Sequence, residues 1–272
     1  MMRAGTATRL CALLCAVFCT IVCTFAAAPL AAQERFIPLD QLKSGFDFLG
    51  SDVQQMQLDD FANPGMLWLD RGAQLWNKPA GPAAKSCATC HGDVRTSMKG
   101  VATRYPMIDK SSGELLNIEG RILQCRTRRQ GAPAFAYESE DLLALTTLVA
   151  HQSRGMPIHV SIDGPARAHF EAGRAFYYQR HGQLNLACTH CHEQNWGKVL
   201  YNEPISQGQP NAYPIYRLYW QTLGSLERRF RSCLFAVRAE MLPYGSPEYR
   251  DLALFLAWRA QGLKIETPGI RR

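Results

Sequence analysis

Two copies of one short pattern could hold a redox cofactor covalently. Cys87, Cys90 and His91 form the pattern Cys-x-x-Cys-His in the first half of the chain, and the second half repeats it. In this pattern two thiols can add to the vinyl groups of a porphyrin, and the histidine that follows becomes an axial ligand of the iron. A zinc site could share the paired thiols but does not need the adjoining histidine. The sequence therefore predicts two covalently bound haem c groups, the second attached through Cys188 and Cys191 with His192 as its ligand.

Two further cysteines are candidates for chemistry. Of the ten cysteines, four lie in an apolar N-terminal run and four in the haem motifs, so Cys125 and Cys233 remain. Each ends a Glu-x-Arg-x-x-x-Cys pattern that places Arg121 or Arg229 about one helical turn before the cysteine. The two could be small buried apolar residues, a disulfide or thiolate ligands. Their equivalent positions favour thiolate ligation of the iron in each half.

A methionine is the alternative ligand at the second iron. Met241 begins a Met-Leu-Pro-Tyr-Gly segment that resembles the Met loop of a simple cytochrome, whereas the matching loop at 131–134 contains no methionine. Basic residues flank both spare cysteines, and beside Cys233 they would suit a small dianion. The first cluster could equally be a solvated helix face. The two clusters are Arg126, Arg128 and Arg129, and Arg228, Arg229 and Arg231.

The elements that must position these residues also occur twice, which indicates an internal repeat. Gly72 and Gly173 each lie 15 residues before the first cysteine of a haem motif, in stretches that suit close helix packing. Apolar residues at helical spacing predict a final helix in each half, over 139–155 and 246–262. Serine is the predicted N-cap of each final helix and glycine the predicted C-cap, namely Ser139, Ser246, Gly155 and Gly262.

This arrangement predicts a mainly α fold of two tandem cytochrome c-like domains related by internal duplication. No convincing run of alternating apolar and polar residues indicates strands. The predicted domains are residues 33–155, which include a mixed N-terminal extension, and residues 156–272. The Pro- and Gly-bearing stretch 156–165 would link them, and Asn63-Pro64-Gly65 predicts a turn in the extension.

Residues 1–32 have the features of a secretory signal peptide. Arg3 and Arg9 precede an apolar run, and an Ala-rich stretch follows it. The run is short for a membrane span, so we expect no span after cleavage and a periplasmic location. The formal net charge is +7, which suits an anionic substrate or an acidic redox partner, and a nucleic acid partner is not expected.

The chain resembles the SoxA family, the dihaem subunits of the thiosulfate-oxidising SoxAX cytochromes. The resemblance rests on the two haem motifs, on Arg-x-x-x-Cys in each half, and on the segments 237–240 and 244–248. It runs from about Phe36 to Gly262, nearly the whole mature chain.

The resemblance implies an L-cysteine S-thiosulfotransferase that joins thiosulfate oxidatively to a cysteine of a SoxYZ-type carrier protein. The partner would be a SoxX-type monohaem subunit, and electrons would leave through haem to a soluble cytochrome c acceptor. The active haem would lie in the C-terminal half, ligated by His192 and by Cys233, which can be a persulfide, with Arg229 binding the anion. The N-terminal haem would use His91 and Cys125.

Two other kinds of function stay open. A non-catalytic dihaem electron carrier would use Met or His as the sixth ligand. Other haem enzymes are a thiosulfate dehydrogenase, which forms tetrathionate and also uses a Cys-ligated haem, and a dihaem peroxidase, which needs an open iron site.

Overall fold

The computed structural model describes residues 37–272, so the predicted signal peptide at 1–32 lies outside the described residues. Most of the ordered backbone is helical, which confirms the prediction of a mainly α fold. Within residues 37–272, no helix combines the length and apolar character that a membrane crossing requires. The α-helices are α2 (Ser51–Leu58), α3 (Leu67–Asn77), α4 (Cys87–His91), α5 (Val94–Ser97), α6 (Ile118–Cys125), α7 (Glu140–His151), α8 (Ala166–Tyr178), α9 (Cys188–His192), α10 (Leu226–Ala236) and α11 (Pro247–Arg259).

The remaining elements are short. The strands pair as β1 with β2, as β3 with β4, and as a three-stranded sheet in the order β6-β5-β7. Strands of two or three residues are too short to leave an alternating pattern in the sequence, which explains why none was predicted. They are β1 (Met107–Ile108), β2 (Leu115–Leu116), β3 (Val199–Leu200), β4 (Glu203–Pro204), β5 (Ile215–Arg217), β6 (Thr222–Gly224) and β7 (Gly269–Arg271), with 3₁₀ turns at Leu39–Gln41, Gly45–Phe48, Pro64–Met66 and Ala102–Arg104 and a π-helical turn at Arg126–Gln130.

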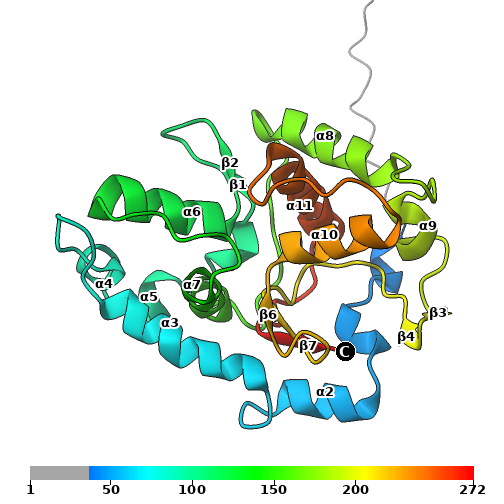
Figure 1. Cartoon of the computed structure of the whole chain (residues 1–272), viewed down its shortest axis with the longest axis horizontal. Helices are drawn as coiled ribbons and strands as arrows, with labels where there is room; N and C mark the ends of the chain where they lie inside the picture. Colours follow the sequence, from blue (N-terminus) through cyan, green and yellow to red (C-terminus); the bar gives the residue numbers. More distant parts are fainter. Residues whose placement is uncertain (1–36) are drawn as a thin grey trace, which may run out of the picture. The chain divides into compact units, whose positions relative to one another are not determined.

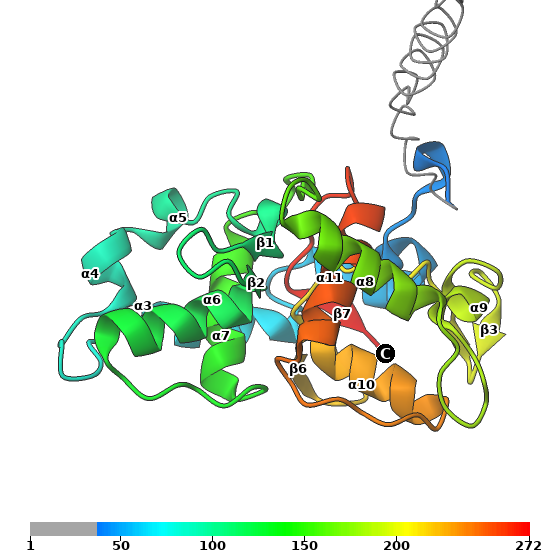
Figure 2. The same cartoon turned by 90° about the horizontal axis from the view of Figure 1, so that it is seen from above.

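The helices form two groups with the same order of elements. Helices α3 to α7 lie on one side and α8 to α11 on the other in both views (Figures 1 and 2). In the first group α3 packs on α7, and in the second α8 packs on α11. In each group the short haem-motif helix, α4 or α9, follows the first long helix, and the helix with the spare cysteine, α6 or α10, precedes the last.

A glycine permits each of the two main helix crossings. A Cβ atom on Gly173 in α8 would lie 2.0 Å from the backbone oxygen of Asp251 in α11. A Cβ atom on Gly72 in α3 would lie 2.5 Å from the backbone oxygen of Ala144 in α7. Real Cβ atoms do not approach backbone this closely, so only glycine allows these separations. The two glycines therefore fix the spacing of the helices that precede the haem motifs.

The apolar core of the second group is the larger one. Phe170 and Tyr249 are fully buried there, and the ring of Phe170 meets Trp258 edge to face at 5.0 Å between centroids. The first group has a smaller buried cluster around Trp76 and Leu145. A covalently bound haem would supply apolar surface that this short core lacks.

The predicted N-terminal ends of the final helices are correct. Ser139 is the N-cap of α7, and its hydroxyl accepts a hydrogen bond from the backbone N–H of Leu142. Ser246 is the N-cap of α11, but its side chain makes no capping hydrogen bond. Pro247 at the first position of α11 fixes the helical backbone instead.

The predicted C-caps are wrong. The C-caps are Gln152 and Ala260, so each helix ends before the glycine chosen from the sequence. Gly155 and Gly262 do have positive φ values, of 82° and 92°. They turn the chain after the helix ends, and the Gly155 N–H then donates to the carbonyl of Ile265. The segment after Gly155 is thereby bonded to the segment after Gly262.

The N-terminal extension is bonded to residues of the second half. The Asn63 side chain accepts from the N–H of Gly65, as the predicted turn requires, and donates to the carbonyl of Pro268 at 2.9 Å. The Gln57 side chain accepts from the N–H of Ile270 in β7. The N–H of Lys43 donates to the side-chain oxygen of Gln207 at 2.8 Å. Residues 37–66 therefore form hydrogen bonds with strand β7 and with the loop that follows α9.

Substitution of Gly173 by alanine tests the crossing of α8 and α11. We expect the free energy of unfolding to fall by about 1–3 kcal/mol, because the added methyl group must displace the α11 backbone. Chemical denaturation measures this loss. The exposed Ala172→Ser variant on the same helix is the control and should stay within about 0.5 kcal/mol of the parent. A Gly173→Ala protein as stable as the parent would contradict the close crossing.

Candidate functional site

The side chain of the third residue of each haem motif caps the helix that carries the motif. The backbone N–H of Ala187 donates to Nδ1 of His190 at 3.0 Å at the start of α9. In the first half, the backbone N–H of Ser86 donates to the Thr89 hydroxyl at 3.0 Å at the start of α4. These bonds satisfy N–H groups that a helix start leaves unpaired. His190 therefore has a capping role.

The imidazole of His192 is fixed by its own half. Its Nδ1 lies 2.8 Å from the carbonyl oxygen of Ser206. A carbonyl only accepts, so Nδ1 donates to it and fixes the ring, and Nε2 is the nitrogen that would ligate a metal. Gly208 packs on the ring, since a Cβ atom there would lie 2.9 Å from it, and the φ of 73° also favours glycine.

The surroundings of His192 fit a haem. Gln209 follows Gly208 and is buried, and within the described residues both polar atoms of its amide lack a hydrogen-bond partner. A bound group with a polar edge would supply these partners, because a buried amide without them costs free energy. The Cys188 and Cys191 thiols are partly exposed on the same short helix and are not paired with any cysteine among residues 37–272.

Cys233 on α10 lies beside His192. Burial raises the pKa of its thiol, but the Arg229 guanidinium and the His192 ring, which is within hydrogen-bonding reach, outweigh this effect and lower the pKa to about 7. The thiolate in turn raises the pKa of Arg229. The structure therefore brings together the three residues that the sequence assigned to the second site.

Arg229 is the member of its basic cluster that faces the cysteine. Arg228 lies over the ring of Trp220 at 4.2 Å, and Arg231 lies over Tyr244 at 4.6 Å. Among residues 37–272, no carboxylate forms an ion pair with Arg229. A second guanidinium, that of Arg217 in β5, lies near Arg229. Burial lowers the pKa of Arg217, and repulsion from Arg229 lowers it further.

Cys125 on α6 has the opposite electrostatic setting. Burial raises the pKa of the Cys125 thiol, and the effect of Arg121 is not sufficient to reverse this. The Arg121 guanidinium is instead held by Asp109 at 2.9 Å and by the side-chain oxygen of Gln124 at 2.6 Å. Hydrogen bonds from Ser111, Gln124 and Arg121 hold the pKa of Asp109 well below its usual range. Arg121 is therefore neutralised by a structural partner.

The other residues of the first half have mixed outcomes. The ring of His91 lies 5.8 Å from that of Trp76, whose indole N–H donates to the carbonyl of Gly92 after the motif. Arg126 lies over the ring of Phe135, whereas the last two arginines of this cluster are exposed. The first basic cluster is thus largely a solvated face.

The role of Met241 as the alternative iron ligand stays a prediction. Met241 lies in the loop after α10 and is 40% exposed. The sequence missed Arg217, Asp109, Gly208 and the carbonyl of Ser206. A backbone carbonyl has no sequence signature, and Asp109 lies in a turn outside every motif, so only the fold could reveal them. Among these residues, only Gly208 could have been noticed in the sequence, because a glycine in an irregular segment often marks a turn or a close backbone approach.

Comparison with known proteins identifies what the chain is similar to. A family model described as SoxA/TsdA, cytochrome c domain, matches residues 71–158. The L-cysteine S-thiosulfotransferase subunit SoxA of Rhodovulum sulfidophilum is 41% identical over 246 residues, which cover 90% of this chain and 85% of that protein. The subunit of the same name from Pseudaminobacter salicylatoxidans is 42% identical over 236 residues, 86% of this chain and 82% of the relative. The crystal structure of SoxXA from P. pantotrophus superimposes with a TM-score of 0.82 at 36% identity, over 85% of this chain and 87% of that one.

Substitution of Asp109 by asparagine tests the pairing of Arg121. The melting temperature should fall clearly, because Arg121 and Gln124 lose a charged acceptor. The lowered pKa means that the carboxylate stabilises the fold above its ordinary pKa of about 3.9, and that this stabilisation is lost as the pH falls further. The difference in melting temperature between the Asp109→Asn variant and the parent should therefore become smaller at acidic pH. Asp93→Asn is the control, since its partner Arg95 is 81% exposed, and it should leave the melting temperature almost unchanged.

Proposed function

The chain belongs to the SoxA family of L-cysteine S-thiosulfotransferase subunits, and on this premise we propose that it is the dihaem subunit of an enzyme that joins thiosulfate to a cysteine of a SoxYZ-type carrier protein. Cys87 and Cys90 would attach one haem c and Cys188 and Cys191 the other. The solved relative is a complex named SoxXA, which supports a SoxX-type monohaem partner for this chain in a heterodimer.

We propose further that the two halves are cytochrome c-like domains related by duplication. The equal order of helices supports this, and so does a repeated contact next to each haem motif. A Cβ atom on Gly81 would lie 2.2 Å from the carbonyl of Gln130, and one on Gly182 would lie 2.2 Å from that of Val237. In both halves the turn before the haem helix thus rests on the chain just after the spare-cysteine helix. The predicted domains, 33–155 and 156–272, follow this division.

The observation that carries the function is the unpaired Arg229 beside Cys233. Thiosulfate is a small dianion, and a guanidinium in partly buried surroundings binds such an anion strongly when no carboxylate neutralises it. Among residues 37–272 no carboxylate forms an ion pair with Arg229, on which Glu203 acts only at longer range, whereas Arg121 is paired with Asp109. We therefore assign thiosulfate oxidation to the C-terminal half, with His192 and Cys233 as iron ligands and Arg229 as the anion-binding residue. His91 and Cys125 would ligate the first haem.

The chain's own residues then have defined tasks. Arg229 holds the oxygen end of thiosulfate so that its outer sulfur faces the carrier cysteine next to Cys233. A new S–S bond forms between these two sulfurs, the carrier S–H bond breaks, and one proton and two electrons leave. A bound haem c supplies one-electron acceptance. Two electrons require a second acceptor, for which we assign the SoxX-type subunit and, beyond it, a soluble cytochrome c.

The remaining assignments concern location. Covalent haem and the predicted signal peptide at 1–32 support a periplasmic protein. The described residues contain no helix suited to a membrane crossing, which is compatible with this assignment.

The Cys233→Ala variant tests the catalytic half. Carrier-dependent reduction of haem by thiosulfate should fall at least about 100-fold while both haems stay attached, because the soft ligand and its thiolate charge are lost. The matched control is Cys125→Ala, which should change the spectrum of the first haem and retain most of the turnover. Normal turnover in Cys233→Ala would refute the assignment. Tetrathionate formation without any carrier would instead favour a thiosulfate dehydrogenase.

The Arg229→Gln variant tests anion binding. A charge-assisted hydrogen bond contributes about 1.5–3 kcal/mol, so kcat/KM for thiosulfate should fall by roughly 10- to 150-fold. Arg228→Gln is the control on the same helix, since Arg228 stacks on Trp220, and its kcat/KM should change little. Equal losses in the two variants would show that general positive charge, and not Arg229, attracts the substrate.

A further inference from the structure

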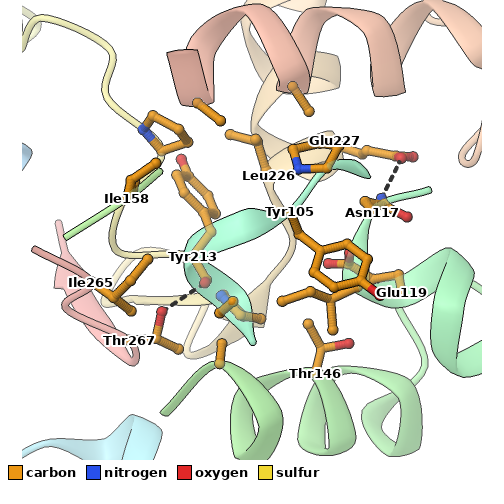
Figure 3. Close-up of a pocket in the computed structure, with 18 residues that line it drawn as sticks. Tyr105, Asn117, Glu119, Thr146, Ile158, Tyr213, Leu226, Glu227, Ile265 and Thr267 are labelled. Carbon is orange, nitrogen blue, oxygen red and sulfur yellow. Dashed lines mark hydrogen bonds between the residues drawn. The ribbon is translucent and has the colours of Figure 1, made fainter. Parts of the chain in front are cut away.

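A cavity of about 100 Å³ lies between the two halves, away from both haem motifs. Residues from both halves line it, among them Tyr105, Glu119 and Thr146 from the first and Tyr213 and Glu227 from the second (Figure 3). Its size is sufficient for ordered water. The proposed reaction does not use any of these residues.

Two buried carboxyl groups face this cavity from equivalent positions. Glu119 is 9% exposed and Glu227 is 2% exposed. Glu119 begins the motif that ends at Cys125, and Glu227 begins the one that ends at Cys233. Asn117, the N-cap of α6, donates to Glu227, so the two glutamates lie where the first turns of α6 and α10 approach each other. A buried carboxylate is costly unless it is paired or protonated.

Hydrogen bonds stabilise the Glu227 carboxylate more than that of Glu119. The Asn117 side chain of the first half donates to Oε1 of Glu227 at 3.2 Å, and the N–H of Gly245 donates to Oε2 at 2.6 Å. The Asn117–Glu227 bond lies on the same side of the cavity as Glu119 in Figure 3. No cation pairs with either carboxylate within residues 37–272. One proton would relieve the repulsion between the two groups.

The cavity also contains acceptors that a neutral carboxylic acid could satisfy. Thr146 is 2% exposed, and within the described part of the chain its hydroxyl has no hydrogen-bond partner. Oε1 of Glu138, next to the same cluster, has no partner either. Among residues 37–272, no group of three His, Cys, Asp or Glu side chains is placed to hold a metal ion. The donor set therefore suits a proton rather than a metal.

We propose that Glu119 and Glu227 form a shared proton-binding site in the cavity between the two halves, and that its proton is linked to the electrons held by the haems. The first part rests on the cavity alone. The second part rests also on the proposed function, because it needs a haem in each half.

The surrounding charges agree with a proton taken up near neutral pH. Burial raises the pKa of Glu119 to about 8 and that of Glu227 to about 7. Repulsion from Glu227 and Glu138 adds to the shift at Glu119, and repulsion from Glu138 adds to the shift at Glu227. Arg250 on α11 acts in the opposite direction on Glu227. The titratable and charged groups around the pair are Tyr105, Tyr137, Glu138, Tyr213 and Arg250, and Arg228 and Arg231 act on Glu138.

Each glutamate is joined to a proposed iron ligand by one helix. Six residues separate Glu119 from Cys125 on α6 and Glu227 from Cys233 on α10, a rise of about 9 Å along the helix axis. A bound proton lowers the cost of an added electron at this range, and by linkage an added electron favours the proton. The site could thus hold a proton while the electrons of one turnover leave separately.

Infrared spectroscopy of the complete dihaem protein tests the proton site directly. The parent should show the carbonyl stretch of a protonated carboxylic acid at about pH 6, and the band should disappear as the pH rises above about 8. Glu119→Gln and Glu227→Gln should each weaken it, and the exposed Glu248→Gln should not. Absence of the band in the parent, or an undiminished band in both variants, overturns the proposal. This readout does not depend on thiosulfate turnover, so its failure is distinct from failure of the proposed function.

Redox titration across the same pH range tests the link to the haems. The midpoint potential of at least one haem should fall with rising pH in the parent and in Glu248→Gln, and its dependence on pH should be weaker in Glu119→Gln. Glutamine has nearly the shape of glutamic acid, and circular dichroism confirms that each variant is folded. An unchanged pH dependence of the midpoint potential in both the Glu119→Gln and the Glu227→Gln variants overturns the link between the proton and the haems. This holds even where the infrared band changes.

Discussion

The proposed site depends on one electrostatic relation, that of a partly buried thiol with an arginine that has no carboxylate partner. Taking a thiolate out of water is unfavourable, and Cys125 shows the usual result, a raised pKa. At Cys233 the guanidinium of Arg229 and the ring of His192 reverse that result. The same guanidinium keeps enough uncompensated charge to attract an anion. One arginine can therefore support both the ligand and the substrate, provided that no carboxylate forms an ion pair with it.

The comparison of the two halves shows how similar motifs acquire different properties. Both carry a glutamate, an arginine and a cysteine at the same spacing on a helix. In the first half Asp109 occupies the arginine, and the surrounding hydroxyl and amide groups keep Asp109 ionised. In the second half no such partner is present among the described residues, and Arg217 adds positive charge. The difference lies outside the motif, in residues whose position the fold determines.

The sequence was sufficient to predict features that repeat or that have a fixed local pattern. The mainly helical fold and the serine N-caps follow from spacing and from local hydrogen bonding. The C-caps were wrong because Gly155 and Gly262 are needed for turns that bond two distant segments, a tertiary reason that a helical pattern does not contain. The carbonyl of Ser206 and the pairing of Asp109 were beyond prediction for the same reason. The assignments of Cys125, Cys233 and Arg229 remain predictions that the geometry supports.

The N-terminal extension has a consequence for how the protein matures. Its residues bond to Gln207, Pro268 and Ile270, so the contacts of the first described residues are complete only once the chain has reached position 270. Contacts this distant in sequence form slowly, because a long loop must close before they are made. Both haem-binding segments are thus synthesised before the chain can close over them. During that interval the thiols of both motifs are open to covalent modification.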